Sequence, residues 1–403
     1  MRPALIAALL ALAPAARADE LDIPLERTAS GTSWQPDATQ MHGAHLMLGD
    51  FMLMIHGAAT LGWDVQAGPR GGHDVISTNW VMAMAQHPLW GGDLSLRTML
   101  SLEPATVAGA GYAQLLQTGE FYNGVHLHDH QHPHDLFMEV ALDYRRPLTD
   151  WLGFELYGGP SGEPALGPVA FMHRASAEED PFPPLAHHWQ DSTHVTFGVA
   201  TAGLYTDKLK LEASWFNGRE PDQNRWDFDL RAFDSFSVRL WAIPEEHVAL
   251  QVSYGYLASP EPPGLAGVVL GVSRVTASLQ LSLQRLDATL VWGRNLEVTP
   301  LDSFLAEARV DLGSGNVPFA RLERVDKTAH DLVVTGVPTY TVYTVHEAVL
   351  GFAHHFPALG PLQPALGARG SLAFVPAELT ALYGARVQPG AFLYLMLQAA
   401  HHH

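Results

Sequence analysis

Five histidines occupy alternate positions just before residues 136–145, and their spacing is the first sign of chemistry in this chain. They are His126, His128, His130, His132 and His134. In an extended backbone, side chains two positions apart lie on one face, so these imidazoles would form a comb. Neutral imidazole binds Zn²⁺, Cu²⁺ or Ni²⁺ readily near pH 7. A straight comb diverges, however, whereas a metal site needs three or four ligands that converge at about 2.0–2.2 Å.

A metal site here would therefore need ligands from other parts of the chain. Further histidines that could contribute are His42, His45, His56, His173, His187 and His188. The candidate ligands are His128, His130, His132, His134, Asp135 and His194, and the candidate ion is Cu or Zn. The competing interpretation is a hydrated loop without a cofactor, in which the histidines bond to one another, to carboxylates and to water.

The sequence DSTH places Ser192 two positions before His194, which suggests a nucleophile and its base. On a strand the two side chains would share a face, but their Cβ atoms would stand about 6–7 Å apart. No third orienting residue and no oxyanion donor can be named. We therefore expect no catalytic residues and no enzyme activity.

Runs of alternating polarity recur along the chain and must position these groups. In 275–284, valine, alanine and leucine occupy one face while threonine, serine and glutamine occupy the other. The runs 94–103, 136–145 and 248–256 alternate in the same way. A period of two with one apolar face indicates half-buried β-strands. Each run is long enough to cross a bilayer as a tilted barrel strand.

The connections between these runs are alternately short and long. The short ones are near 146–150, 206–207, 244–246 and 285–286, and the long ones are near 104–135, 158–192, 217–234, 258–272, 296–302 and 327–339. Outer-membrane barrels have short periplasmic turns and long extracellular loops. A soluble β-sandwich, the alternative, has no reason to keep that alternation. The sequence predicts an all-β, antiparallel up-and-down transmembrane barrel of about 16 strands, within a range of about 12–18, with both termini in the periplasm.

The N-terminus carries an export signal. Arg2 precedes the apolar run 4–13, and Ala16-Arg17-Ala18 offers a small-x-small cleavage site. We assign residues 1–18 to a signal peptide, 19–45 to an N-terminal leader and 46–403 to one barrel domain. The expected location is the outer membrane of a Gram-negative bacterium.

Charge and cysteine content exclude two classes of function. The 403-residue chain has a formal net charge of -19, which argues against nucleic acid as a partner because nothing would neutralise its phosphates. It contains no cysteine, so it is not a disulfide scaffold.

Charged residues on the predicted strands should face the lumen, because a charge facing lipid at mid-depth costs about 2–4 kcal/mol. The candidate lumen residues are Arg97, Glu139, Asp143, Arg145, Glu212, Arg239, Glu307 and Arg309. Mixed charges in the long loops could narrow the channel by folding into it. The candidate constriction residues are Arg174, Asp191, Arg219, Asp222 and Arg225; ordinary solvated loop charge is their alternative interpretation.

Aromatic residues near strand ends are typical of the interfacial girdles of such barrels. The predicted girdle comprises Trp63, Trp90, Tyr144, Trp151, Tyr157, Tyr205, Trp241, Tyr256 and Trp292.

Several phrases resemble a family of bacterial outer-membrane β-barrel proteins that has no settled activity. They are ASGTSWQPDATQMHG, QHPHDLFMEVAL, GEPALGPVAFMHR, HHWQDSTHVTFGVATAG and FNGREPDQNRWDFD, and the similarity extends over most of the mature chain. The resemblance implies the barrel fold and its location. His132, Pro133, His134 and Asp135 match the family pattern, whereas His126, His128 and His130 depart from it.

Together these features predict a porin-like channel with outer-membrane lipid around it and small solutes or ions as its partners. Lumen charge and loop constriction would set passage. The second hypothesis is a histidine-rich outer-membrane protein that binds or passes Cu or Zn.

Overall fold

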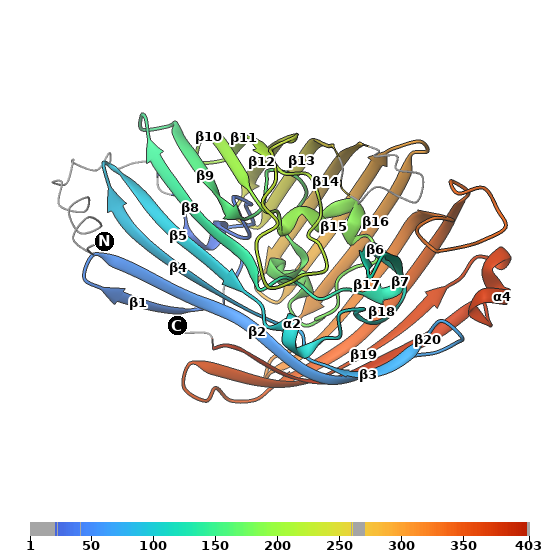
Figure 1. The fold of residues 1–403 in the computed structure, drawn as a ribbon. Helices are drawn as coiled ribbons and strands as arrows, with labels where there is room; N and C mark the ends of the chain where they lie inside the picture. The colour runs from blue at the N-terminus through green and yellow to red at the C-terminus, as the bar shows by residue number, and fades with distance from the viewer. Residues whose placement is uncertain (1–20, 22, 41, 259, 261–270, 401–403) are drawn as a thin grey trace.

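The computed structural model describes residues 21, 23–40, 42–258, 260 and 271–400. It is a closed antiparallel barrel of sixteen strand positions (Figure 1), as predicted. The predicted signal peptide, 1–18, lies outside the described residues.

The wall is built from eight pairs of strands joined in sequence order. The strands that run in the direction of β2 are β2 (Phe51–Gln66), β5 (Gly92–Leu100), β9 (Gly153–Ser161), β11 (Leu209–Phe216), β13 (Val248–Leu257), β15 (Leu286–Leu296), β17 (Asn316–Thr328) and β19 (Leu362–Phe374). The strands that return are β4 (Asn79–Leu89), β8 (Phe137–Pro147), β10 (Val199–Tyr205), β12 (Ser235–Glu245), β14 (Val272–Leu283), β16 (Leu301–Val310), β18 (Val342–His355) and β20 (Val387–Ala399).

Strand β2 closes the barrel and is bordered by two short extra strands. One edge of β2 pairs with β20 from Ala58 onward and with β1 (Ala44–Leu48) before that. Its other edge pairs with β4 and then with β3 (Gly72–Ile76). Strands β1 and β2 therefore form a hairpin, and β1 and β3 extend existing strand positions of the barrel rather than adding new ones.

The short connections lie at one end of the barrel, called here the turn end, and the long ones at the loop end. The connection 297–300 between β15 and β16 was expected to be long but has four residues. The loop 101–136 contains the helix α2 (Glu103–Thr106) and a separate hairpin of β6 (Tyr112–Tyr122) and β7 (Val125–Gln131). The loop 375–386 contains η5 (Ala377–Leu379) and α4 (Thr380–Tyr383).

The outer face of the wall is apolar, as the alternation predicts. Leu211, Leu290, Leu322, Leu350 and Leu395 are 53–71% exposed. Soluble proteins rarely expose so much contiguous apolar surface, so this belt requires lipid around it. None of the helices among the described residues is long and apolar enough to cross a membrane.

The predicted girdle was partly wrong. Trp63, Trp90 and Trp151 are exposed on the outer face, but Tyr157, Tyr205 and Trp241 are buried and face the lumen. Their polar ends explain this orientation for two of them: the Tyr157 hydroxyl donates to Glu139 at 2.8 Å, and Trp241 Nε1 donates to Glu212 at 3.1 Å.

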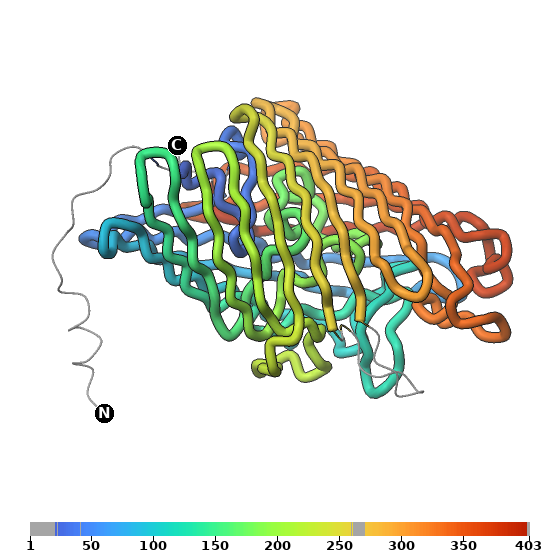
Figure 2. The backbone as a smooth tube through the Cα atoms, turned by 90° about the horizontal axis from the view of Figure 1, so that it is seen from above, coloured from blue at the N-terminus to red at the C-terminus, as the bar shows by residue number. Residues whose placement is uncertain are grey.

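Two segments occupy the interior of the barrel. One is residues 23–40 of the expected leader, with the turn η1 (Leu25–Arg27); it lies inside the ring of strands instead of preceding it. The other is the loop 162–198, with η2 (Phe171–His173), η3 (Ala175–Ala177), α3 (His187–Gln190) and η4 (Ser192–His194). The green loop and the dark blue N-terminal segment are seen within the barrel in Figures 1 and 2. We call them the N-terminal plug and the loop plug.

Candidate functional site in the barrel lumen

The charged residues predicted for the lumen all face inward. Arg97, Glu139, Asp143, Glu212, Arg239 and Glu307 are buried, and Arg145 and Arg309 are half-buried. They pair between adjacent strands on the lumen face: Arg97 Nε of β5 donates to Glu139 of β8 at 2.9 Å, and Arg309 Nε of β16 donates to Asp287 of β15 at 3.1 Å. The period of two places these side chains, because each lies on the face opposite the exposed leucines.

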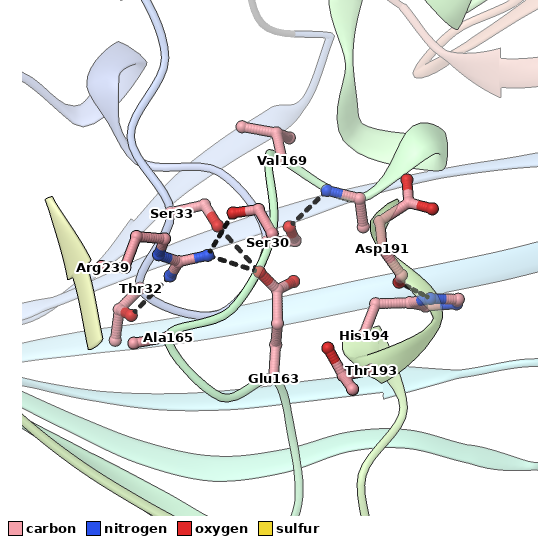
Figure 3. Close-up of polar contacts among 12 residues, drawn as sticks. Ser30, Thr32, Ser33, Glu163, Ala165, Val169, Asp191, Thr193, His194 and Arg239 are labelled. Atoms are coloured by element: carbon pink, nitrogen blue, oxygen red, sulfur yellow. Dashed lines mark hydrogen bonds and ion pairs between the residues drawn. The ribbon is translucent and has the colours of Figure 1, made fainter. Parts of the chain in front are cut away.

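The N-terminal plug is held by a cluster around Arg239, seen in Figure 3. Arg239 donates to Glu212 (2.8 Å), to Glu163 (3.2 Å) and to the Thr32 hydroxyl (3.1 Å). Thr32 in turn donates to Glu212 at 2.5 Å, and Ser33 donates to Glu163 at 2.8 Å. Hydroxyls of the N-terminal plug therefore complete an ion network formed by Glu212 and Arg239 of the wall and Glu163 at the start of the loop plug. Burial raises the pKa of Glu163 to about 7, although Arg239 opposes the shift.

The loop plug is held through Arg174, one of the predicted constriction residues. Arg174 Nη1 donates to Asp191 at 2.7 Å within the loop, and Arg174 Nε donates to Glu307 of β16 at 2.7 Å. Burial alone would raise the pKa of Asp191, but Arg174 and a hydrogen bond from His187 lower it below its usual value. Buried charges that lack partners are very costly, so this pairing keeps the loop inside the barrel.

The other constriction residues lie near the loop end. Arg225 is buried and contacts Glu120 of β6 and, at 3.1 Å, Asp135. Burial raises the pKa of Asp135 to about 7, even with Arg225 beside it. Arg219 is half-buried. Asp222 is exposed and its backbone N–H donates to Asp229 at 2.7 Å, so it does not line the interior.

Three of the predicted metal ligands, His132, His134 and His194, gather where the hairpin β6–β7 meets the loop plug. The ring centroids of His134 and His194 are 5.4 Å apart. His132 lies 5.7 Å from His188, which the ligand prediction mentioned only as a contributor. Asp135 faces Arg225 instead.

The predicted comb does not form. Asp129 has a φ of 57°, which interrupts the extended backbone. The side chains of His128 and His130 bond locally, His128 Nδ1 with Asp129 at 2.8 Å and His130 Nδ1 with the His128 carbonyl at 3.1 Å. The continuous face of the comb is therefore lost, and the two histidines that follow Gln131, His132 and His134, contact the histidines of the loop plug.

Two carboxylates bonded to histidines, Glu103 and Glu220, are site residues that the sequence did not indicate, and a third, Asp191, was predicted only as a constriction residue. Glu103 bonds His134 Nδ1 at 2.9 Å, Glu220 bonds His188 Nδ1 at 2.9 Å, and Asp191 bonds His187 Nδ1 at 2.7 Å. Nothing in the local sequence marks Glu103 or Glu220, because each lies more than 30 positions from its partner. Burial lowers the pKa of His194 well below its usual value, and the neighbouring His187 and His134 act in the same direction.

Two cavities border these histidines. The smaller, about 20 Å³, is lined by His132, His134, His187, His188 and His194. The larger, about 130 Å³, lies between the two plugs and β2, β4 and β20, and is lined by His42, His56, His134 and His173. His134 borders both. The interior is thus filled at its centre by side chains, with room for a few water molecules or a small ion.

The nucleophile hypothesis finds no support in this geometry. The Ser192 hydroxyl accepts a hydrogen bond from Arg274 at 3.1 Å, and His194 Nδ1 bonds the Asp191 carbonyl at 2.9 Å. The two side chains are thus engaged by other groups.

No protein-family model and no curated protein matches this chain. Solved structures do match in fold. The anion-selective porin from Comamonas acidovorans aligns with a TM-score of 0.54 at 9% identity, covering 86% of this chain and 99% of that one. OmpF of Salmonella typhi, in complex with daunomycin, aligns with a TM-score of 0.54 at 8% identity over 88% and 100% of the two chains. OmpT, an outer membrane protein of Vibrio cholerae, aligns with a TM-score of 0.52 at 7% identity over 88% and 99%. The fold of this chain is therefore that of a porin-like outer-membrane β-barrel.

Proposed function

We propose that this protein is a non-enzymatic channel of the Gram-negative outer membrane, in which the two plugs and the charge of the lumen control the passage of small solutes or ions. The apolar belt and the porin-like fold support the membrane location. The charged interior supports passage of polar solutes, since water-filled channels of outer-membrane barrels have polar interiors.

The pairing of Arg174 with both Asp191 and Glu307 is the observation that carries this proposal. It ties a loop of 37 residues (162–198) to the wall through charges at 2.7 Å rather than through an apolar core alone. An ion-paired loop can separate from the wall when water or solute competes for the charges. In this proposal the filled lumen is the closed state of the channel, and opening requires the loop plug to shift.

Planar-bilayer recording tests this directly. Refolded wild-type protein should give small or rare conductance steps, and Arg174→Gln should give larger or more frequent ones because Glu307 and Asp191 lose their shared cation. The matched control is Arg294→Gln, which removes a guanidinium from the outer face, where it pairs with Asp302 at 2.5 Å. That control should conduct as wild type does.

If Arg174→Gln gives no additional conductance, a second variant, which lacks the loop plug, tests the channel proposal. Gly162 and Thr196 bridge each other through backbone hydrogen bonds of 3.0 and 2.9 Å, so residues 163–195 can be replaced by a short Gly-Ser turn without separating β9 from β10. A folded barrel that lacks this loop and shows no conductance steps over many insertions would overturn the channel proposal.

A further inference from the structure

Seven histidines carry a buried ring nitrogen without a hydrogen-bond partner among the described residues. They are His56, His87, His126, His134, His173, His188 and His194. An unsatisfied buried polar group costs about 1–3 kcal/mol, and native proteins keep few of them. Histidine is the most frequent residue type among the buried side-chain atoms without a partner in the described part of the chain, and such imidazole nitrogens are potential metal ligands.

Six of the seven lie in three groups along the lumen, which together we call the histidine row, and His87 lies outside it. At the loop end His126 packs against His330, with centroids 5.0 Å apart. In the middle, His188, His187 and His194 follow at spacings of 5.2 and 5.0 Å, and His134 is 5.4 Å from His194. Toward the turn end, His173 and His56 are 5.4 Å apart.

The middle of the row has the hydrogen-bonding pattern of metal-binding histidines. Metal-ligating imidazoles usually give one nitrogen to a carboxylate or carbonyl and present the other to the metal. Here Nδ1 of His134 bonds Glu103, Nδ1 of His188 bonds Glu220, and Nδ1 of His194 bonds a backbone carbonyl. In all three, Nε2 is the nitrogen left without a partner, and all three line the cavity of about 20 Å³.

The loop end of the row has a cluster of converging ligands. Atoms of His126, His330 and Asp331 lie within 4.8 Å of one another, and both ring nitrogens of His126 are buried without partners. The His330 side chain is 41% exposed. This cluster is therefore reachable from the loop end, and three ligands would leave a coordination position open for water.

Near the turn end of the row, methionine side chains add thioether sulfur atoms to the possible ligands. The cavity of about 130 Å³ that contains His42, His56 and His173 is also lined by five methionines: Met54, Met82, Met84, Met172 and Met396. A given nitrogen site generally binds Cu²⁺ more tightly than Zn²⁺, thioethers are soft ligands that favour Cu⁺, and Mg²⁺ and Ca²⁺ require oxygen ligands. The ligand chemistry of the row is thus nitrogen with sulfur nearby, and it is poorly suited to alkaline-earth ions.

We propose that the lumen carries a transition-metal cation, copper in preference to zinc, which enters at His126, His330 and Asp331 and is passed along the histidine row. This inference rests on the proposed channel function and specifies its cargo. The row supplies several weak sites in sequence, so the ion is bound at each point without being trapped.

Copper binding by the full-length protein in detergent is the first test. Calorimetry and electron paramagnetic resonance with Cu²⁺ should detect a nitrogen-coordinated ion in the wild type. His134→Ala/His194→Ala should weaken binding at the inner site by at least about tenfold, and Glu220→Gln by about 10–100-fold, because it removes the carboxylate that orients His188. Glu220→Gln preserves shape and so guards against loss of folding.

The matched control is His87→Ala, since His87 also has a buried unpartnered nitrogen but lies outside the row, stacked on Phe51. It should bind Cu²⁺ as the wild type does, and Mg²⁺ should bind to none of the proteins. A Cu²⁺ isotherm and spectrum unaltered in the His134/His194 variant, in Glu220→Gln and in His126→Ala/His330→Ala would overturn the proposal.

Transport separates this inference from the channel proposal. Proteoliposomes that contain a copper-quenched dye should report Cu²⁺ entry that is slowed at least about tenfold by His134→Ala/His194→Ala, while KCl conductance in bilayers is retained. Conductance without nitrogen-coordinated copper would support the channel proposal and refute the copper proposal. Nitrogen-coordinated copper in a barrel without any conductance would refute the channel proposal and, with it, the proposed transit of copper.

Discussion

Two polar regions of the lumen are similarly buried but differ in how many of their polar atoms have hydrogen-bond partners. Around the N-terminal plug, every guanidinium nitrogen of Arg239 and both carboxylate oxygens of Glu212 have partners. Along the histidine row, His56, His126, His173, His188 and His194 each keep a nitrogen without one. The first region is organised to hold a segment in place. The second leaves ligand atoms available, which is what a binding or transfer function requires.

The largest expected effect comes from breaking the Arg239 cluster. Arg239→Met would leave Glu212 and Glu163 buried without their shared cation, and removal of one partner from a buried ion network costs about 3–5 kcal/mol. Chemical unfolding in detergent, followed by tryptophan fluorescence, measures this. Arg324→Met is the control: Arg324 pairs with Asp326 at 3.0 Å near the surface, where such a pair contributes about 0–1 kcal/mol. Equal losses in the two variants would contradict the comparison.

Acid should have opposite effects on the Arg239 cluster, which holds the N-terminal plug, and on the Arg174 pairing, which holds the loop plug. Glu163, with its pKa raised to about 7, binds a proton more readily in the folded state, so its environment becomes more stable as pH falls below 7. Asp191 has a lowered pKa, so the stability that it contributes is present above its ordinary value of about 4 and is lost as pH falls below that. The charged groups that face Asp191 are Arg174, His187 and His194.

Hydrogen exchange, corrected for the intrinsic pH dependence, can resolve this difference. Between about pH 7 and 4, backbone amides near Ser33 should keep or gain protection, and those near Phe171, whose N–H donates to Asp191 at 3.0 Å, should lose protection only below about pH 4. Loss of protection in both plugs over one pH range would show that they are released together.

Removal of a single hydroxyl from the Arg239 cluster should have a smaller effect on the free energy of unfolding. Ser33→Ala removes one donor to Glu163, which keeps Arg239 as a partner. A hydrogen bond to a charged group contributes about 1.5–3 kcal/mol, and the remaining partner reduces the loss toward the lower figure. The same unfolding assay should place Ser33→Ala well below Arg239→Met, with Thr206→Ala, an exposed turn hydroxyl, as its control.

The smallest effect is expected in the histidine row. His173→Phe replaces an imidazole whose Nε2 has no partner by an apolar ring of similar shape, beside Trp80 at 4.8 Å. Removing an unsatisfied buried polar atom is nearly neutral or stabilising, so the unfolding free energy should change by less than about 1 kcal/mol. A loss as large as that of Arg239→Met would mean that this nitrogen has a structural partner after all.

The barrel wall was predictable because its determinants are local. A period of two in segments such as 275–284 decides which side chains meet lipid, and the regular alternation of turns and loops decides the direction of each strand. Even there, local reasoning placed Trp241 at the membrane surface. Its inward position follows from Glu212, which accepts its indole N–H across the β11–β12 pair.

The contents of the lumen could not be predicted in the same way. Glu163 meets Arg239 over 76 positions and Arg174 meets Glu307 over 133, and no periodicity links such residues. The leader was expected to precede the barrel, yet Thr32 and Ser33 complete the ion network inside it.

By itself, the amino-acid sequence determined an alternating chain that must close into a barrel in lipid, because each strand has one apolar and one polar face. It also determined that histidines are concentrated in the long connections, above all in 104–135. Only the tertiary structure decided that the barrel is filled, which imidazoles lie in one row and which carboxylates orient them. The physical reason is that side-chain direction along a strand is a local property, whereas the convergence of charges and ligands depends on how distant segments fold into one enclosed space.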